Sequence, residues 1–241
     1  MMKTVIQSVT PTVNALCVQG AFHRVRGVPC QDAVGTWRSE DGHLAVVVAA
    51  DGAGSRKFAK ESAEAAVKSV IELFRDTGNV GLSDEETISA LFRGQDALRL
   101  PKEDLGTTLL FAAVKDGEYL AGHIGDGVIL KRENGAFSAF SEPENGEFSY
   151  LTFFLPTSDS KHLRLYRGAV SPGASFLLAT DGVSGALFDM EAGTAAPACE
   201  KIDTANRSLP RKEFLKLLSD ALQGVFAEIS RDDKSIAVLS I

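Results

Sequence analysis

Apolar residues in this chain fall mostly in short runs separated by polar turn residues, a pattern that predicts β-strands. The two most continuous runs each end in an aspartate followed by a glycine, at Asp51-Gly52 and Asp181-Gly182. Asp41-Gly42, Asp116-Gly117 and Asn134-Gly135 separate other runs and predict hairpin turns. The strands predicted from this pattern are 12–19, 33–38, 43–50, 107–115, 118–124, 127–132, 136–140, 163–167, 175–180 and 235–241.

Three longer segments carry apolar residues at the 3.6-residue spacing of a helix. They are 58–76, a segment that begins at a capping Ser83 and runs to about Leu98, and 211–229. Strands, two helices, more strands, a helix and a last strand predict the α+β class, with antiparallel sheets packed under helices. Because no repeat or low-complexity linker interrupts the chain, we expect one domain over residues 1–241.

Composition and charge narrow the function classes. The 241 residues are 44% hydrophobic and 24% charged, which is enough for a sizeable core, and the formal net charge is −7. That charge argues against a nucleic-acid or anionic-membrane partner. Three cysteines without a C-x-x-C pair argue against a disulfide framework or a structural zinc site. With no signal-peptide pattern and no apolar run long enough to span a bilayer, we expect a cytoplasmic protein, and a monomer.

Four aspartates stand where strands are predicted to end or begin. Asp51 and Asp181 close the two most continuous runs, Asp126 lies in Gly125-Asp126-Gly127, and Asp232 precedes the last strand. Aspartate is depleted in strands and an unpaired buried charge is costly, so a bound cation is the simplest explanation for this pattern. Ligand sets made only of oxygen favour Mg²⁺ or Mn²⁺ over zinc or copper. The sequence therefore predicts a divalent metal site.

The order of these motifs resembles the metal-dependent protein serine/threonine phosphatases of the type 2C family, especially the compact bacterial members. The likeness runs from about Gly20 to the C-terminus. Its elements are Pro29-Cys30-Gln31-Asp32, Ala50-Asp51-Gly52, Gly106-Thr107-Thr108, Gly125-Asp126-Gly127, Ala179-Thr180-Asp181-Gly182 and Asp232-Asp233-Lys234-Ser235. Each is weak alone, and their shared order makes the resemblance strong.

The resemblance implies a fold, a reaction and a set of roles. The fold is a four-layer α-β-β-α sandwich of two antiparallel sheets, with a short flap near 141–165. The reaction is hydrolysis of phosphoserine and phosphothreonine in proteins by a hydroxide that bridges two Mn²⁺ or Mg²⁺ ions. A cognate serine/threonine kinase is an implied partner.

The same resemblance implies the ligands of each ion. Asp51 bridges the two ions, Asp181 and Asp232 hold the first, and the carbonyl of Gly52 binds the second. Asp32 contributes to the second site directly or through water, and Asp126 matches the position that holds a third, weaker ion.

The chain departs from the family pattern where the substrate is gripped and protonated. Ala53 follows Gly52 where some members carry a histidine, and Gly27 occupies the position of the usual phosphate-binding arginine. Arg24 or Arg26 is the predicted substitute, because bidentate phosphate recognition favours arginine, and Arg56 is a third candidate.

Two alternatives therefore stay open: a weakly active or inactive module that binds phosphoproteins, and a phosphatase for small molecules. A serine hydrolase is excluded because no histidine follows Ser184, and the glycine patterns of nucleotide binding are absent.

Overall fold

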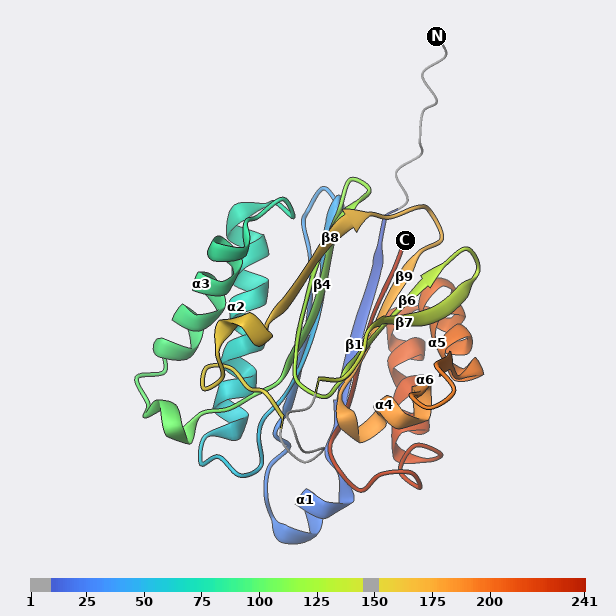
Figure 1. Cartoon of the computed structure of the whole chain (residues 1–241). Coiled ribbons are helices and arrows are strands. Elements are labelled where there is room, and N and C mark those ends of the chain that lie inside the picture. The colour runs from blue at the N-terminus through green and yellow to red at the C-terminus, as the bar shows by residue number, and fades with distance from the viewer. Residues whose placement is uncertain (1–9, 145–151) are drawn as a thin grey trace.

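Two five-stranded antiparallel sheets lie face to face, with helices over both outer surfaces (Figure 1). The computed structural model describes residues 10–144 and 152–241. The first sheet has the order β2 (Asp32–Arg38), β3 (Leu44–Asp51), β4 (Leu109–Lys115), β5 (Glu118–Ile124) and β8 (Arg164–Ala169). The second has the order β1 (Thr12–Val18), β12 (Lys234–Ser240), β9 (Ser175–Ala179), β6 (Val128–Glu133) and β7 (Ala136–Ser141).

Helices form the two outer layers. The first sheet is covered by α2 (Ala59–Thr77) and α3 (Asp84–Asp96), and the second by α4 (Asp181–Leu187), α5 (Pro197–Ser208) and α6 (Arg211–Gln223) (Figure 1). The short helix α1 (Ala21–Arg26) lies at one end of the sandwich, and a small hairpin joins β10 (Phe188–Asp189) to β11 (Thr194–Ala195). Two 3₁₀ turns occupy Lys102–Asp104 and Ser160–His162. The predicted α-β-β-α sandwich of the α+β class is confirmed.

The continuous apolar run of β3 follows from its place between two apolar layers. Val46 and Val48 pack in the cluster that includes α2 and α3, whereas Val47 and Ala49 pack in the cluster between the sheets. A strand covered on both faces has no solvent side, so it does not alternate apolar and polar residues. The second sheet forms a third cluster with α4, α5 and α6.

The predicted strands agree with the observed ones to within a few residues, and the helices show the larger differences. The helix predicted over 211–229 is wrong at its end, because α6 stops at Gln223, before Gly224. Helices α1 and α5 were not predicted. Residues 145–151 of the predicted flap lie outside the described residues.

Candidate metal centre

Three of the predicted metal ligands meet at one end of the sandwich. Asp51 ends β3, Asp126 lies in the turn between β5 and β6, and Asp181 begins α4. Their carboxylate oxygens lie within 4.8 Å of one another. Asp51 and Asp126 are partly buried and Asp181 is exposed, so the group opens to solvent on the side of α4. We refer to these three residues as the aspartate group.

Asp32 lies beside the aspartate group and links the two sheets. It faces Asp51 in the register of β2 and β3. Its Oδ2 accepts hydrogen bonds from Thr180 Oγ1 at 2.9 Å and from Ser235 Oγ at 2.7 Å. Thr180 directly precedes Asp181, and Ser235 belongs to β12 in the second sheet. Asp32 therefore fixes the end of the second sheet relative to Asp51.

The Gly106-Thr107-Thr108 motif fixes the backbone of Asp51. The amide of Asp51 donates to Thr108 Oγ1 at 3.0 Å, and the amide of Thr108 donates to the Asp51 carbonyl at 2.8 Å. Thr107 Oγ1 also donates to that carbonyl, at 3.0 Å. These three bonds hold the end of β3 against the segment that enters β4, and they use only the backbone atoms of Asp51.

The electrostatics of the site reflect negative charges gathered close together and partly shielded from water, with Asp181 at the side that faces solvent. Burial, followed by the charges of Asp32 and Asp181, raises the pKa of Asp51 well above its ordinary value. Desolvation, followed by the charges of Asp126 and Asp232, raises the pKa of Asp181 to about 7. Burial raises the pKa of Asp32 to about 6, although hydrogen bonds from Ser235 and Thr180 oppose the change. A cation placed among these groups would reverse such shifts.

The donor atoms present fit a hard divalent ion. Asp126 Oδ2 accepts a hydrogen bond from Thr152 Oγ1 at 2.7 Å, but the buried Oδ1 has no hydrogen-bond partner among the described residues. An unpaired buried carboxylate oxygen is costly unless an ion or water binds it. Carboxylate oxygens are the ligands that Mg²⁺ and Mn²⁺ prefer.

The two Asp-Gly pairs of the site, Asp51-Gly52 and Asp181-Gly182, need glycine because the backbone of another segment lies very close to each. A Cβ on Gly52 would lie 2.3 Å from the carbonyl oxygen of Ala59, and one on Gly182 would lie 1.8 Å from that of Asp233. The second contact packs the chain entering β12 against the start of α4, beside Asp181. Glycine is thus what allows the strand ends to converge.

Asp232 is close enough for its charge to raise the pKa of Asp181. It is not a member of the aspartate group; its carboxylate lies within 4.8 Å of ligand atoms of His23 and Asp233. The shared first-ion site of Asp181 and Asp232 stays a prediction, as do the roles of Asp32 and of the Gly52 carbonyl.

Sequence reasoning missed the function of Asp233 and His23 in the structure. The buried Asp233 carboxylate accepts hydrogen bonds from the amides of Gly20 and Gln31, each at 2.7 Å, and pairs with His23 Nδ1 at 2.8 Å. Burial opposes ionisation of Asp233, but these hydrogen bonds outweigh it and lower its pKa. Asp233 thereby ties the segment around α1 to the start of β12. The adjacent pair Asp232-Asp233 was the available sign that a second carboxylate lies at the start of β12, but the sequence prediction gives a role only to Asp232.

The predicted phosphate-binding arginines lie on α1 at the same end of the molecule as α4 (Figure 1). Arg24 donates to the carbonyl of Gln19 at 2.9 Å, and the Arg26 guanidinium lies 3.6 Å above the ring of Phe22. Within residues 10–144 and 152–241, neither forms an ion pair with a carboxylate. Arg56 donates to the carbonyl of Glu103 at 2.7 Å. Their part in phosphate binding stays a prediction.

Comparison with known families decides the class of this site. The family model described as Protein phosphatase 2C matches residues 19–223, most of the chain. The chain belongs to the protein phosphatase 2C family. The predicted resemblance is confirmed, and so is the predicted enzyme class, a metal-dependent phosphoester hydrolase.

Several solved structures share the fold of this phosphatase 2C chain. The catalytic domain of the serine/threonine protein phosphatase PstP, in complex with two manganese ions, is 18% identical with a TM-score of 0.67 over 96% of this chain and 99% of that one. PppA, described as a key regulatory component of T6SS in Pseudomonas aeruginosa, is 17% identical with a TM-score of 0.66 over 96% and 98%. RsbX in complex with magnesium is 14% identical with a TM-score of 0.59 over 95% and 94%.

At these identities the structures establish the fold of the phosphatase 2C chain and nothing more specific. Comparison with curated proteins gives no significant match. Among the described residues, no helix has the length and apolar character needed to cross a membrane.

Proposed function

We propose that this phosphatase 2C chain hydrolyses phosphoserine and phosphothreonine in proteins and requires Mn²⁺ or Mg²⁺. The observation that carries the proposal is the aspartate group, whose three carboxylates come from three separate segments. Desolvation and the charges of neighbouring aspartates raise the pKa values of Asp51 and Asp181, so the arrangement is unfavourable without a cation. Membership of the family supports a phosphoprotein as the substrate.

The ligand assignment follows the sequence prediction. Asp51 would be shared between two ions, with Asp181 and Asp232 on the first and the Gly52 carbonyl and Asp32 on the second. Asp126, with its unpaired Oδ1, would hold a third ion. Bound divalent ions supply activation of water and neutralise charge on a phosphoryl group.

The protein's own residues position these groups. Thr107 and Thr108 hold the Asp51 backbone, while Thr180 and Ser235 orient the Asp32 carboxylate. Such supporting hydrogen bonds fix ligand orientation, on which metal affinity depends. The exposed side of Asp181 admits the phosphate from solvent, and Arg24 or Arg26 would contact it from α1. No protein nucleophile is needed.

The decisive experiment measures turnover of a phosphothreonine peptide and of p-nitrophenyl phosphate with Mn²⁺, and again after EDTA. We expect Mn²⁺-dependent turnover of both substrates. The Asp51→Asn variant should lose at least about a hundredfold in kcat/KM, because one carboxylate serves both ions.

Asp116→Asn is the matched control. Asp116 also belongs to an Asp-Gly pair, but it lies in an exposed hairpin with φ of 49°, which asparagine tolerates, so activity should be unchanged. Turnover that persists in EDTA, or full activity of the Asp51 variant, contradicts the proposal. Turnover of p-nitrophenyl phosphate alone would favour a small-molecule phosphatase, and Mn²⁺ binding without any turnover would favour the phosphoprotein-binding module.

A further inference from the structure

Two of the three cysteines touch each other beside Asp32, although no sequence pattern pairs them. Cys17 Sγ and Cys30 Sγ lie 2.9 Å apart. Cys17 is on β1 of the second sheet, and Cys30 is on the segment that enters β2 of the first. Both sulfur atoms are near the Asp32 carbonyl oxygen, at 3.7 and 3.8 Å. A covalent bond between them would therefore join the two sheets next to a predicted metal ligand.

The two thiols lack the further ligands that a site for a soft metal ion such as zinc would need. Within the described part of the chain, the groups of three or more potential ligands are the aspartate group and His23 with Asp232 and Asp233, and neither contains a cysteine. A zinc site generally needs four ligands, or three and a water. The two sulfur atoms of a disulfide are about 2.0 Å apart, so forming the bond requires the Sγ atoms to approach each other by about 1 Å.

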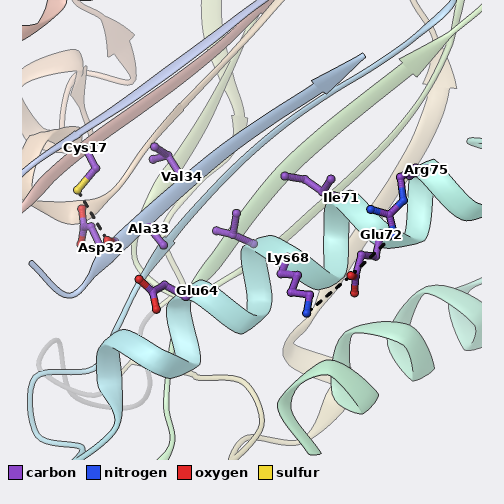
Figure 2. Close-up of a pocket in the computed structure, with 10 residues that line it drawn as sticks. Cys17, Asp32, Ala33, Val34, Glu64, Lys68, Ile71, Glu72 and Arg75 are labelled. Carbon is purple, nitrogen blue, oxygen red and sulfur yellow. Dashed lines mark hydrogen bonds and ion pairs between the residues drawn. The ribbon is translucent and has the colours of Figure 1, made fainter. Parts of the chain in front are cut away.

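A groove gives small molecules access to the pair. It has a volume of about 590 Å³ and runs between the edges of β1 and β2 and the surface of α2. Figure 2 shows Cys17 and Asp32 at one end of the groove and Arg75 at the other, with Glu64 and Lys68 along the helix side. Cys17 lines this groove, whereas Cys30 does not. A reagent that enters the groove thus meets Cys17 first.

We propose that Cys17 and Cys30 form a reversible disulfide, by exchange with a low-molecular-weight disulfide, that weakens metal binding at Asp32. The Cys17 thiolate attacks one sulfur of the small disulfide, forms a mixed disulfide and releases one small thiol. Cys30 then attacks the Cys17 sulfur and releases the second small thiol. The two protein thiols lose two electrons and two protons, and the small disulfide gains them as two thiols.

The cross-link acts on Asp32 from two sides. Cys30 is two residues before Asp32 in the chain, and Cys17 faces Ser235 in the register of β1 and β12. Ser235 is one of the two residues that hold the Asp32 carboxylate. A movement of about 1 Å at the sulfur atoms therefore disturbs both the backbone of Asp32 and its supporting hydrogen bond. We expect Mn²⁺ affinity to fall about tenfold, the lower end of what a lost supporting contact costs.

The role of Asp32 rests on the proposed function, but the test does not use turnover. The full chain is incubated with glutathione disulfide, and intact mass, free thiols after denaturation and calorimetric Mn²⁺ binding are measured. Free thiols should fall from three to one, the mass should fall by two hydrogens, and the Mn²⁺ dissociation constant should rise about tenfold. Dithiothreitol should reverse all three changes.

Two variants separate this pair from other thiol chemistry. The double variant Cys17→Ser/Cys30→Ser should keep the same Mn²⁺ affinity before and after glutathione disulfide. Cys199 is buried in the other helical layer, where it donates to the carbonyl of Leu187. Cys199→Ala is therefore the control. In this variant Cys17 and Cys30 should still form the disulfide.

Three results would overturn the proposal: no cross-link, a glutathione adduct that persists on Cys17, or a cross-link that leaves Mn²⁺ affinity unchanged. Absence of phosphatase activity in a protein that binds Mn²⁺ would count against the proposed function alone.

Discussion

At the scale of single residues, the candidate site depends on two glycines as much as on its carboxylates. Gly182 leaves room for the carbonyl oxygen of Asp233, which a Cβ would approach to 1.8 Å. Backbone cannot move aside as the end of a flexible side chain can. The chain entering β12, which carries Asp232, would have to shift away from Asp181.

Two glycines of α4, Gly182 and Gly185, differ in the space that a Cβ would have, so their alanine variants test the close approach. Gly182→Ala should lower the free energy of unfolding by about 1–3 kcal/mol or more and weaken Mn²⁺ binding, measured by urea denaturation and calorimetry. Gly185, also in α4, faces open space, because a Cβ added there would have no heavy atom within 4 Å. Gly185→Ala should therefore be neutral or stabilising by up to about 1 kcal/mol. Equal effects of the two substitutions would show that the close approach is unimportant.

At the scale of elements, local signals decided which helices could be predicted. The predicted start of α3 is confirmed in detail: the Ser83 side chain accepts from the amide of Glu86, and the Glu86 side chain accepts from the amide of Ser83. Every group in that cap lies within four consecutive residues. The predicted extension of α6 to residue 229 is wrong. The helical spacing of apolar residues continues past Gly224, but the helix itself ends at Gln223, and Val225 and Ile229 are exposed.

Helix α5 was missed because its buried face is partly polar. Asp203 and Asn206 lie on that face with Cys199 and Ile202, which interrupts the apolar period. Asp203 accepts hydrogen bonds from Ser175 and Ser240, and Asn206 bonds to Ser240 and Asn14. These partners come from strands of the second sheet, so no local pattern could reveal that the polar residues face inward.

The capping box of Ser83 and Glu86 should stabilise α3. Ser83→Ala removes an acceptor for the Glu86 amide and should cost about 1 kcal/mol of the free energy of unfolding, measured by urea denaturation. Ser83→Thr keeps both the acceptor for the Glu86 amide and the hydroxyl that donates to Glu86 Oε2, so it should lie close to the parent protein. If the alanine and threonine variants are equally stable, the cap contributes nothing to the stability of the domain.

At the scale of the whole molecule, the sequence singled out the aspartates that meet at one end of the sandwich, but not the contacts that orient Asp32 beside them. Asp51, Asp126 and Asp181 could be predicted because each has a local pattern, an apolar run or flanking glycines. The bond from Ser235 to Asp32 joins residues 203 positions apart, and it exists only because β12 of the second sheet packs against β2 of the first. The contact between Cys17 and Cys30 arises in the same way, where the edges of the two sheets meet.

The clustered carboxylates also make the stability of the whole domain depend on pH. Asp32 and Asp181 have pKa values of about 6 and about 7 in the folded protein, against an ordinary value of 3.8. A carboxyl group whose pKa is raised by folding holds its proton more tightly in the folded state. Its contribution is fully present below about pH 4 and is lost as the pH rises through the folded pKa. The metal-free protein should therefore lose stability between about pH 4 and pH 7.

Bound Mn²⁺ should reverse this trend, because the ion and the protons compete for the same oxygen atoms. The rise in Tm on adding saturating Mn²⁺ should be larger at about pH 8 than at about pH 5.5, measured by thermal unfolding with and without the ion. Asp51→Asn should show a much smaller rise at both pH values, since it removes the carboxylate that we propose is shared between two ions, whereas Asp116→Asn should match the parent. A rise in Tm that is independent of pH in the parent protein would mean that Mn²⁺ binds away from these carboxylates, and with it the metal centre assigned to this end of the sandwich would fail.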